Sequence, residues 1–224
     1  MIQRQRIEKK KEKRNGYLTF MKEYCRNLKT VGSIVPDSNV CYNSMLKHVP
    51  FDSADLILEF GAGSGTVTKE IIRRKRPETV FMSFEKNKTF FNRLSSNVSG
   101  DNVHFTRDDV FNSVSTLAAE VGMKHNGVDC IVSTLPCSSI KFDTLVQDAV
   151  IPLLKDGGFF IQYMHSLSLL KGFRAKPILK KHFNQVRSGF VFLNVPPVFI
   201  YTCRKAENGR AREEGRAAMN REAS

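Results

Sequence analysis

The stretch "LILEFGAGSGTVT", residues 56–68, joins an apolar run to three glycines within a five-residue turn. An apolar run, a glycine turn and a helix start together predict a strand whose end meets a ligand. Gly61, Gly63 and Gly65 allow positive φ angles and let ligand atoms approach the backbone. The N–H groups at the start of the following helix lie at the positive end of its dipole. This stretch therefore predicts a nucleotide-binding corner.

An acid just before the turn narrows the class of ligand. The turn "GAGSG" is shorter than the GxGxxG of dinucleotide-binding corners, and it lacks the Lys-Ser/Thr of a phosphate-binding loop. A carboxylate at the mouth of the turn, that of Glu59, would repel a pyrophosphate but attract a cation. S-adenosylmethionine carries an ammonium group and a positive sulfur. We therefore predict this cofactor rather than a dinucleotide.

Two further acids come at the ends of the next two expected strands. Glu85 ends the second strand, where a carboxylate can accept hydrogen bonds from both ribose hydroxyls. Asp109 follows the third strand in "TRDDVF", where it can accept a hydrogen bond from the adenine amino group, with Val110 against the ring. The candidate cofactor-binding residues are Glu59, Gly61, Ala62, Gly63, Gly65, Thr66, Glu85, Lys86, Asp109, Val110 and Ser133.

Strand and helix patterns alternate along the chain. Strands are expected near 55–60, 79–84, 102–106, 128–133 and 157–163, and helices near 65–75, 87–97, 110–122, 142–154 and 174–182. Such alternation predicts a parallel sheet with helices on both faces. The segment "QVRSGFVFLNVPPVFIYTCRK", 185–205, contains two strand-like runs separated by a tight reversal at 194–197. We therefore expect a Rossmann-like α/β fold with a seven-stranded mixed sheet whose last strand is antiparallel.

Charge is unevenly distributed along the 224 residues, whose net charge is +13. Residues 1–29 hold ten Lys/Arg and three Glu, and a basic arm of this kind attracts phosphate on nucleic acid or on an anionic membrane. We expect four regions: a basic arm that is helical or disordered (1–16), amphipathic and cap helices (17–48), one catalytic domain (49–205) and a disordered tail (206–224).

Composition indicates the cellular compartment. The five cysteines lack metal-ligand spacing, which is typical of reduced thiols in a cytosolic protein and predicts no metal site. No apolar run approaches the roughly 20 residues that a membrane-spanning helix needs. The basic N-terminus has no apolar segment of the secretory type. We predict a cytoplasmic protein, whichever phosphate-bearing surface its basic arm contacts.

The segment after the fourth strand, "IVSTLPCSS", is the candidate acceptor loop. Methyl transfer from a sulfonium requires in-line alignment of donor and acceptor more than acid–base groups. Ser133, Thr134 and Leu135 would place hydroxyls and carbonyls beside the methyl group, and Pro136 would fix the turn. A generic strand-ending loop explains the same letters equally well.

The chain resembles the bacterial phospholipid N-methyltransferases of the soluble, rRNA-dimethylase-like type, within the class I S-adenosylmethionine-dependent superfamily. The resemblance runs from about Phe20 to Lys205 and covers "FMKEYCRNLKTVGSIVPDS", "LILEFGAGSGTVTKEI", "FEKN", "RDDVF", "VSTLP", "GGFFIQYMHS" and "SGFVFLNVPPVFIYTCRK". It implies sequential methylation of the amine of phosphatidylethanolamine towards phosphatidylcholine, with a helix before the core that docks on an anionic bilayer. The resemblance therefore implies a cytoplasmic protein that associates peripherally with the inner face of the membrane.

Two positions depart from that family pattern. The family has a Tyr-Gly pair after the fifth strand, where this chain reads "YMHS" at 163–166, and a tryptophan in the N-terminal helix, where this chain has Tyr24. Tyr24, Tyr163 and His165 are candidates to line the amine pocket or to take its proton, although His165 can equally be a structural histidine. Residues 17–28 can likewise serve only to cover the cofactor.

The main alternative is an rRNA adenine N6-dimethyltransferase-like enzyme. Those enzymes carry an N-L-P-aromatic motif, in which the aromatic residue stacks on a flipped base. Here Ser133 replaces the asparagine and Cys137 replaces the aromatic residue, and the chain leaves no length for their C-terminal RNA-binding domain. The sequence therefore disfavours nucleic acid as the partner. A non-catalytic basic membrane-binding module is the third hypothesis.

Overall fold

The computed structural model describes residues 39–113, 116–117, 125–135, 141–165, 169–192 and 197–207. The basic arm, Tyr24, Pro136 and most of the tail lie outside these residues, so the predictions about them stay predictions. The same holds for most of the helix expected over 110–122, of which residues 110–113 and 116–117 are described and helical.

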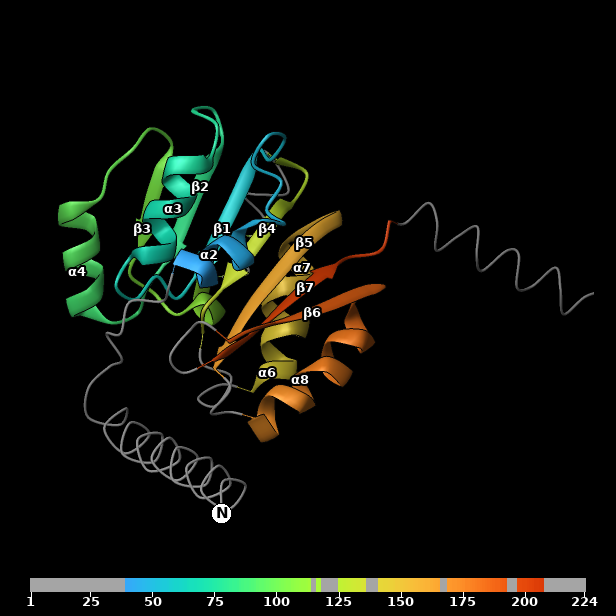
Figure 1. The fold of residues 1–224 in the computed structure, drawn as a ribbon. Helices are drawn as coiled ribbons and strands as arrows, with labels where there is room; N and C mark the ends of the chain where they lie inside the picture. Colours follow the sequence, from blue (N-terminus) through green and yellow to red (C-terminus); the bar gives the residue numbers. More distant parts are fainter. Residues whose placement is uncertain are drawn as a thin grey trace, which may run out of the picture. The chain divides into compact units, whose positions relative to one another are not determined.

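Strands and helices alternate as the sequence predicts, and Figure 1 shows their arrangement. The strands are β1 (Leu56–Phe60), β2 (Val80–Phe84), β3 (Val103–Thr106), β4 (Val128–Ser133), β5 (Leu154–His165), β6 (Gln185–Val191) and β7 (Val198–Arg204). The helices are α2 (Asn39–Leu46), α3 (Thr66–Arg74), α4 (Lys88–Asn97), α6 (Phe142–Thr144), α7 (Ile151–Leu153) and α8 (Leu169–His182), with a π-helical segment (Leu145–Val150) between α6 and α7.

The strands form one seven-stranded sheet in the order β3-β2-β1-β4-β5-β7-β6. The first five strands of the chain pair in parallel, whereas β7 runs antiparallel to both β5 and β6. The predicted mixed sheet with an antiparallel last strand is therefore confirmed. The strand order reverses between β1 and β4, and open α/β sheets bind ligands at the carboxyl ends of the strands beside such a point.

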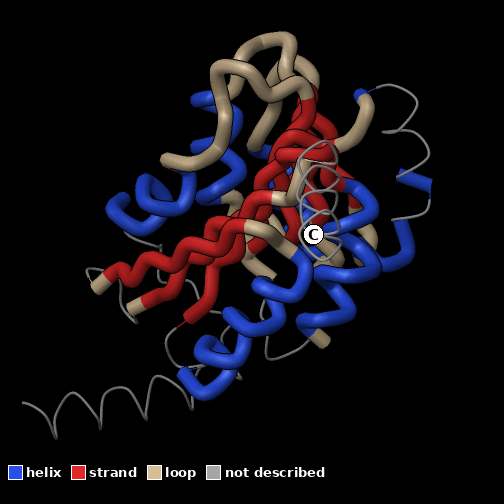
Figure 2. Tube along the Cα trace, turned by 90° about the vertical axis from the view of Figure 1, so that its right-hand side faces the viewer, coloured by secondary structure: helices blue, strands red, loops and turns tan. Residues whose placement is uncertain are grey.

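Apolar clusters lie on both faces of the sheet, and Figure 2 shows helices on either side of the strands. One cluster packs α2 and α3 against the sheet, and the other packs α8 and the helical segment 142–153 against the opposite face. Every residue of β1 and β4 is buried, as expected of central parallel strands covered on both sides. The strands that lead into the glycine turn and the acceptor loop therefore lie side by side in the buried middle of the sheet.

Two elements differ from the sequence prediction. β5 begins at Leu154 rather than near 157, because the pairing with β4 shifts register between Val128 and Cys130. The extra residues at 155–158 include two glycines, so they read as a turn in the sequence. α8 also begins earlier than expected, at Leu169, and contains Pro177 in its interior.

Candidate functional site

The glycine turn lies between the carboxyl end of β1 and the start of α3. Gly61, Gly63 and Gly65 have φ angles of 85°, 54° and 80°, all in the left-handed region that glycine adopts at low cost. The N–H groups of Gly61 and Ala62 donate to the Phe84 carbonyl at 2.8 and 3.3 Å, which ties the turn to the end of β2. The predicted corner is thus formed by two neighbouring strand ends.

The three glycines differ in what surrounds them. A Cβ at Gly65 would lie 2.5 Å from Leu94 of α4, and one at Gly61 would lie 3.0 Å from the side chain of Leu135. A Cβ at Gly63 would meet no atom within 4 Å. A side chain at either of the outer two glycines would therefore displace a neighbouring leucine, whereas Gly63 borders open space above the turn.

Glu59 lies beneath the glycine turn, whereas the sequence predicts its carboxylate at the mouth of the turn. Its side chain is fully buried on the α3 face, and its Oε2 accepts hydrogen bonds from the Thr68 and Ser83 hydroxyls, both at 2.7 Å. Its Oε1 is buried and has no hydrogen-bond partner among the described residues. Burial raises the pKa of the Glu59 carboxyl to about 7, against the lowering effect of those two hydrogen bonds.

This arrangement fits a cationic ligand. An acceptor oxygen without a partner inside a protein carries a desolvation cost, and nearby positive charge offsets that cost. The Oε1 atom of Glu59 is such an oxygen. The glycine turn above it has open space beside Gly63, where a ligand can lie. The residues therefore suit a ligand that brings positive charge to the turn.

Glu85 follows β2 and adjoins the same turn. Its Oε2 accepts a hydrogen bond from the Gly63 N–H at 2.8 Å, and its Oε1 accepts one from the Asn87 N–H at 2.8 Å. These two bonds fix the carboxylate while leaving each oxygen a further lone pair for ligand hydroxyls. The structure thus brings the first two predicted acids to one turn.

Asp109 and Val110 follow β3 on the neighbouring loop. The Asp109 carboxylate accepts a hydrogen bond from the Phe111 N–H at 3.2 Å and lies 3.6 Å from the Lys86 ammonium. Val110 is buried in the core cluster. The preceding acid, Asp108, is occupied by hydrogen bonds from Ser113, Asn112 and the Asp109 N–H, which lower its pKa. The Asp109 carboxylate thus accepts fewer hydrogen bonds from the loop than the Asp108 carboxylate does, which leaves it more acceptor capacity for a ligand.

The acceptor loop is tied directly to the glycine turn. The Thr134 N–H donates to the Phe60 carbonyl at 3.0 Å, and the Thr134 hydroxyl donates to the Gly61 carbonyl. Ser133 is fully buried at the end of β4, and its hydroxyl lies 3.4 Å from the Leu135 N–H. Two hydrogen bonds therefore hold the loop against the end of β1 and the turn.

Tyr163 and His165 pair with each other at the end of β5. The Tyr163 hydroxyl lies 3.4 Å from His165 Nδ1, and the two rings meet edge to face with centroids 5.0 Å apart. Tyr163 belongs to the core cluster on the α2/α3 face. Because side chains alternate along a strand, Ser133, which pairs with Gln162, faces the other side of the sheet. The structure does not bring these two candidates together with the Ser133 side chain.

Gln162 is a site residue that the sequence prediction missed. Its side chain is fully buried, and its Nε2 donates to the Leu135 carbonyl at 3.2 Å and to the Tyr163 carbonyl at 2.6 Å. Its Oε1 is buried without a partner among the residues described. A lone glutamine within the apolar run "FFIQYM" was the available signal.

Solved structures of other proteins show the same fold. Human methyltransferase-like protein 13, in complex with SAH, covers 80% of this chain and 90% of its own with a TM-score of 0.60 and 15% identity. A cofactor-bound protein from MTB covers 79% of this chain and 84% of its own with a TM-score of 0.64 and 12% identity. The chain has the class I methyltransferase fold, and its glycine turn and carboxylates fit S-adenosylmethionine as the cofactor.

A curated protein is similar to this chain in sequence over most of its length. The ornithine lipid N-methyltransferase of Singulisphaera acidiphila is 24% identical over 192 residues, which are 84% of this chain and 95% of the relative. No protein-family model matches the chain. The fold, the site and this relative together support an S-adenosylmethionine-dependent methyltransferase that is similar to bacterial lipid N-methyltransferases.

Replacing Gln162 by methionine tests its role beside the acceptor loop. The variant removes the donor to the Leu135 carbonyl, so the loop loses one of its fixed points. We expect methyl-transfer turnover to fall about tenfold, in line with the loss of one buried hydrogen bond, while cofactor affinity changes less than about twofold. Steady-state kinetics and calorimetry measure the two quantities.

Gln147, which is exposed on the π-helical segment, offers the matched control for that variant. Gln147→Met makes the same chemical change away from the loop and is expected to leave both quantities unchanged. Equal losses of turnover and of cofactor affinity in Gln162→Met would contradict a role confined to the acceptor loop.

Proposed function

We propose that this protein transfers methyl groups from S-adenosylmethionine to the primary amine of a membrane lipid, with phosphatidylethanolamine as the substrate and phosphatidylcholine as the end product. The observation that carries the proposal is the similarity to an ornithine lipid N-methyltransferase over nearly its whole length. Ornithine lipids and phosphatidylethanolamine both present a primary amine, so both are chemically equivalent acceptors at the reacting atom.

The cofactor-side residues have separable tasks in this proposal. The chemistry supplied by the cofactor is an electrophilic methyl group on a sulfonium centre. Glu59 holds negative charge beneath the turn, and Glu85 presents hydrogen-bond acceptors beside Gly63. Asp109 and Val110 would bound the adenine end on the third strand's loop. Lys86, which lies near the Asp109 carboxylate, helps fix that loop.

The acceptor side must supply a neutral amine. A primary amine with a pKa of about 10.4 is neutral in about one molecule in a few thousand at pH 7, so reaching the neutral form costs roughly 4–5 kcal/mol. A pocket that excludes water lowers an amine pKa and reduces this cost. The Ser133–Leu135 loop is buried or half-buried beside the glycine turn, which supports its role in holding the amine there.

Direct product analysis tests the proposal. The purified full chain would be incubated with methyl-labelled cofactor and vesicles that contain phosphatidylethanolamine, ornithine lipid or only phosphatidylcholine, and separately with rRNA. We expect label in the two amine-bearing lipids and none in the phosphatidylcholine vesicles. Label in rRNA alone would replace the proposal with the RNA alternative.

Membrane docking through the N-terminal arm is the second part of the proposal. Within the described residues, no helix has the length and apolar character to cross a bilayer. Residues 1–29 hold ten Lys/Arg and three Glu, and each basic residue near an anionic surface contributes up to about 1 kcal/mol. We therefore propose that the arm binds the inner membrane surface and brings the site to its lipid.

Deleting residues 1–28 tests the arm. The truncated chain is expected to lose most of its sedimentation with phosphatidylglycerol vesicles, and the salt dependence of the remaining binding should weaken because the charges of the arm are gone. Deletion of residues 208–224, which hold four Arg and three Glu, is the control and should bind as the full chain does. Unchanged vesicle binding after removal of 1–28 would show that another surface is the anchor.

A further inference from the structure

A second basic region lies in the body of the protein, apart from the arm. Residues 157–206 hold eight Lys/Arg and no Asp or Glu, whereas residues 30–156 hold thirteen Lys/Arg and fifteen Asp/Glu. The segment 157–206 includes β6, β7, α8 and most of β5. Positive charge therefore gathers at the antiparallel end of the sheet.

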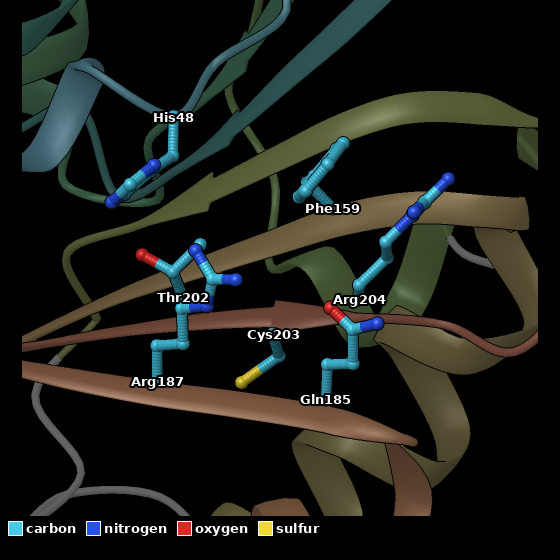
Figure 3. A pocket seen from close by; sticks show the side chains of 7 residues that line it. All are labelled: His48, Phe159, Gln185, Arg187, Thr202, Cys203 and Arg204. Carbon is cyan, nitrogen blue, oxygen red and sulfur yellow. The ribbon is translucent and has the colours of Figure 1, made fainter.

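A cavity of about 260 Å³ lies at this end of the sheet, over β5, β6 and β7 (Figure 3). It is lined by His48, Phe159, Gln185, Arg187, Thr202, Cys203 and Arg204. Cavities for small ligands begin at about 300 Å³, so this one suits a ligand of few atoms.

Strand register explains why the polar groups converge there. Thr202 of β7 pairs with Arg187 of β6, and Arg204 pairs with Gln185, so these four side chains project from the same face of two adjacent strands. His48, from the loop after α2, lies across the cavity from them in Figure 3. Donors thus approach the cavity from the sheet and from the loop above it.

The two arginines of the cavity are held differently. Arg204 donates to the Gly157 carbonyl at 3.1 Å, pairs with Glu207 at 2.7 Å and stacks over the Phe159 ring at 5.6 Å. Arg187 is exposed and forms no ion pair with any carboxylate of the described residues. Its charge therefore lacks the partner that Arg204 has.

The histidine opposite Arg187 adds no positive charge of its own. Burial, followed by the charges of Lys47 and Arg187, lowers the pKa of His48, so its ring is neutral at pH 7. The charged groups that line the cavity are therefore Arg187 and Arg204, of which Arg204 is already paired with Glu207, and Lys47 adds positive charge next to His48. An anion would find net positive charge here.

We propose that this cavity binds a phosphate-type oxyanion, held by the Arg187 guanidinium, the Thr202 hydroxyl and the Gln185 amide. Guanidinium groups bind phosphate through paired charge-assisted hydrogen bonds, and a tetrahedral oxyanion accepts from several directions at once. The phosphate belongs either to the free ion or to the headgroup of an anionic lipid. No residue that lines this cavity belongs to the glycine turn, so the proposed phosphate binding does not depend on which methyl acceptor the protein uses.

Calorimetry with inorganic phosphate tests the site in the full chain, at constant ionic strength balanced with chloride. We expect binding in the millimolar range or tighter, weakened about tenfold or more in Arg187→Gln, in line with the loss of a hydrogen bond from a charged donor. Thr202→Val, which keeps the side-chain shape, should weaken binding severalfold and guards against misfolding of the first variant.

Arg93→Gln is the matched control, because it removes the same charge from an exposed arginine on α4. This variant is expected to bind phosphate as the unchanged protein does. No phosphate binding at millimolar concentration, or equal weakening in Arg187→Gln and Arg93→Gln, would overturn the proposal, since the second result indicates general charge attraction.

Vesicles distinguish the two sources of phosphate. The full chain, Arg187→Gln and Arg93→Gln would be sedimented with phosphatidylcholine vesicles that contain or lack phosphatidylglycerol. Weaker sedimentation of Arg187→Gln alone on the anionic vesicles assigns the cavity to a lipid headgroup. Equal sedimentation of all three proteins, together with the weakened phosphate binding, assigns it to the free ion.

Discussion

Replacing Glu59 by glutamine is expected to weaken S-adenosylmethionine binding about tenfold or more. The glutamine oxygen can still accept from Thr68 and Ser83, whereas its amide group takes the position of the buried Oε1 atom that has no partner. The substitution therefore keeps the shape and removes the negative charge that Glu59 carries above its pKa of about 7, so the titration is made at pH 8. Interactions with charged groups contribute about 1.5–3 kcal/mol, and about 1.4 kcal/mol is a tenfold change in affinity.

Glu78→Gln is the control for this comparison. Glu78 is an exposed acid that pairs with Arg76, far along the sheet from the glycine turn. Calorimetric titration with the cofactor should give the same affinity for Glu78→Gln as for the unchanged protein. An affinity for Glu59→Gln within about twofold of that value would remove Glu59 from the cofactor site.

The same substitution changes how stability depends on pH. The pKa of Glu59 rises from 4.5 to about 7 in the folded protein, so folding favours the protonated carboxyl. That stabilisation is complete below pH 4.5 and is lost as the pH rises towards 7, by roughly 3 kcal/mol for a difference of this size. Denaturant unfolding at pH 5 and pH 8 should show this loss in the unchanged protein and not in Glu59→Gln. A bound cation should reduce the loss.

The fold could be predicted because its main elements follow local patterns. Buried strands such as β1 and β4 are mostly apolar runs, and the reversal before β7 is marked by two prolines. The start of β5 could not be predicted, because the residues 155–158 form an irregularity that exists only against β4. A register shift depends on two strands at once, and no single window of sequence contains it.

The site shows the same division between local and long-range information. The acids Glu59, Glu85 and Asp109 could be found because each lies at or just after the end of an expected strand. The burial of Glu59 depends on Thr68 and Ser83, which come from two other elements. The proposed phosphate-binding cavity depends on the pairing of β6 with β7. A net charge summed over the whole chain does not show where the basic residues gather, so the cavity could not be predicted from it.

A pair of glycine substitutions should separate cofactor binding from folding. A Cβ at Gly63 meets no atom within 4 Å, and its φ of 54° equals that of Asn102, a residue with a side chain. Gly63→Ala should therefore fold with a loss of only about 1 kcal/mol. Its methyl group would enter the open space above the turn, where we expect the cofactor to lie. Cofactor affinity should fall tenfold or more, because the loss of about 1.4 kcal/mol of binding free energy is a tenfold change in affinity.

Gly65→Ala should behave in the opposite way. Its Cβ would lie 2.5 Å from Leu94, at a φ of 80°, so both the helix packing and the backbone are strained. We expect a loss of several kcal/mol in the free energy of unfolding, in line with overpacking of a core contact. Thermal unfolding and calorimetry with the cofactor measure the two effects for both variants.

Gly189→Ala controls for the loss of a glycine as such, because its Cβ also meets nothing within 4 Å, on the exposed strand β6. It should change neither stability nor cofactor affinity appreciably. If Gly63→Ala binds the cofactor as tightly as Gly189→Ala does, the space beside Gly63 is not where the cofactor lies. Because the alanine at 63 keeps the fold, that result would count against the site itself and not against the integrity of the variant.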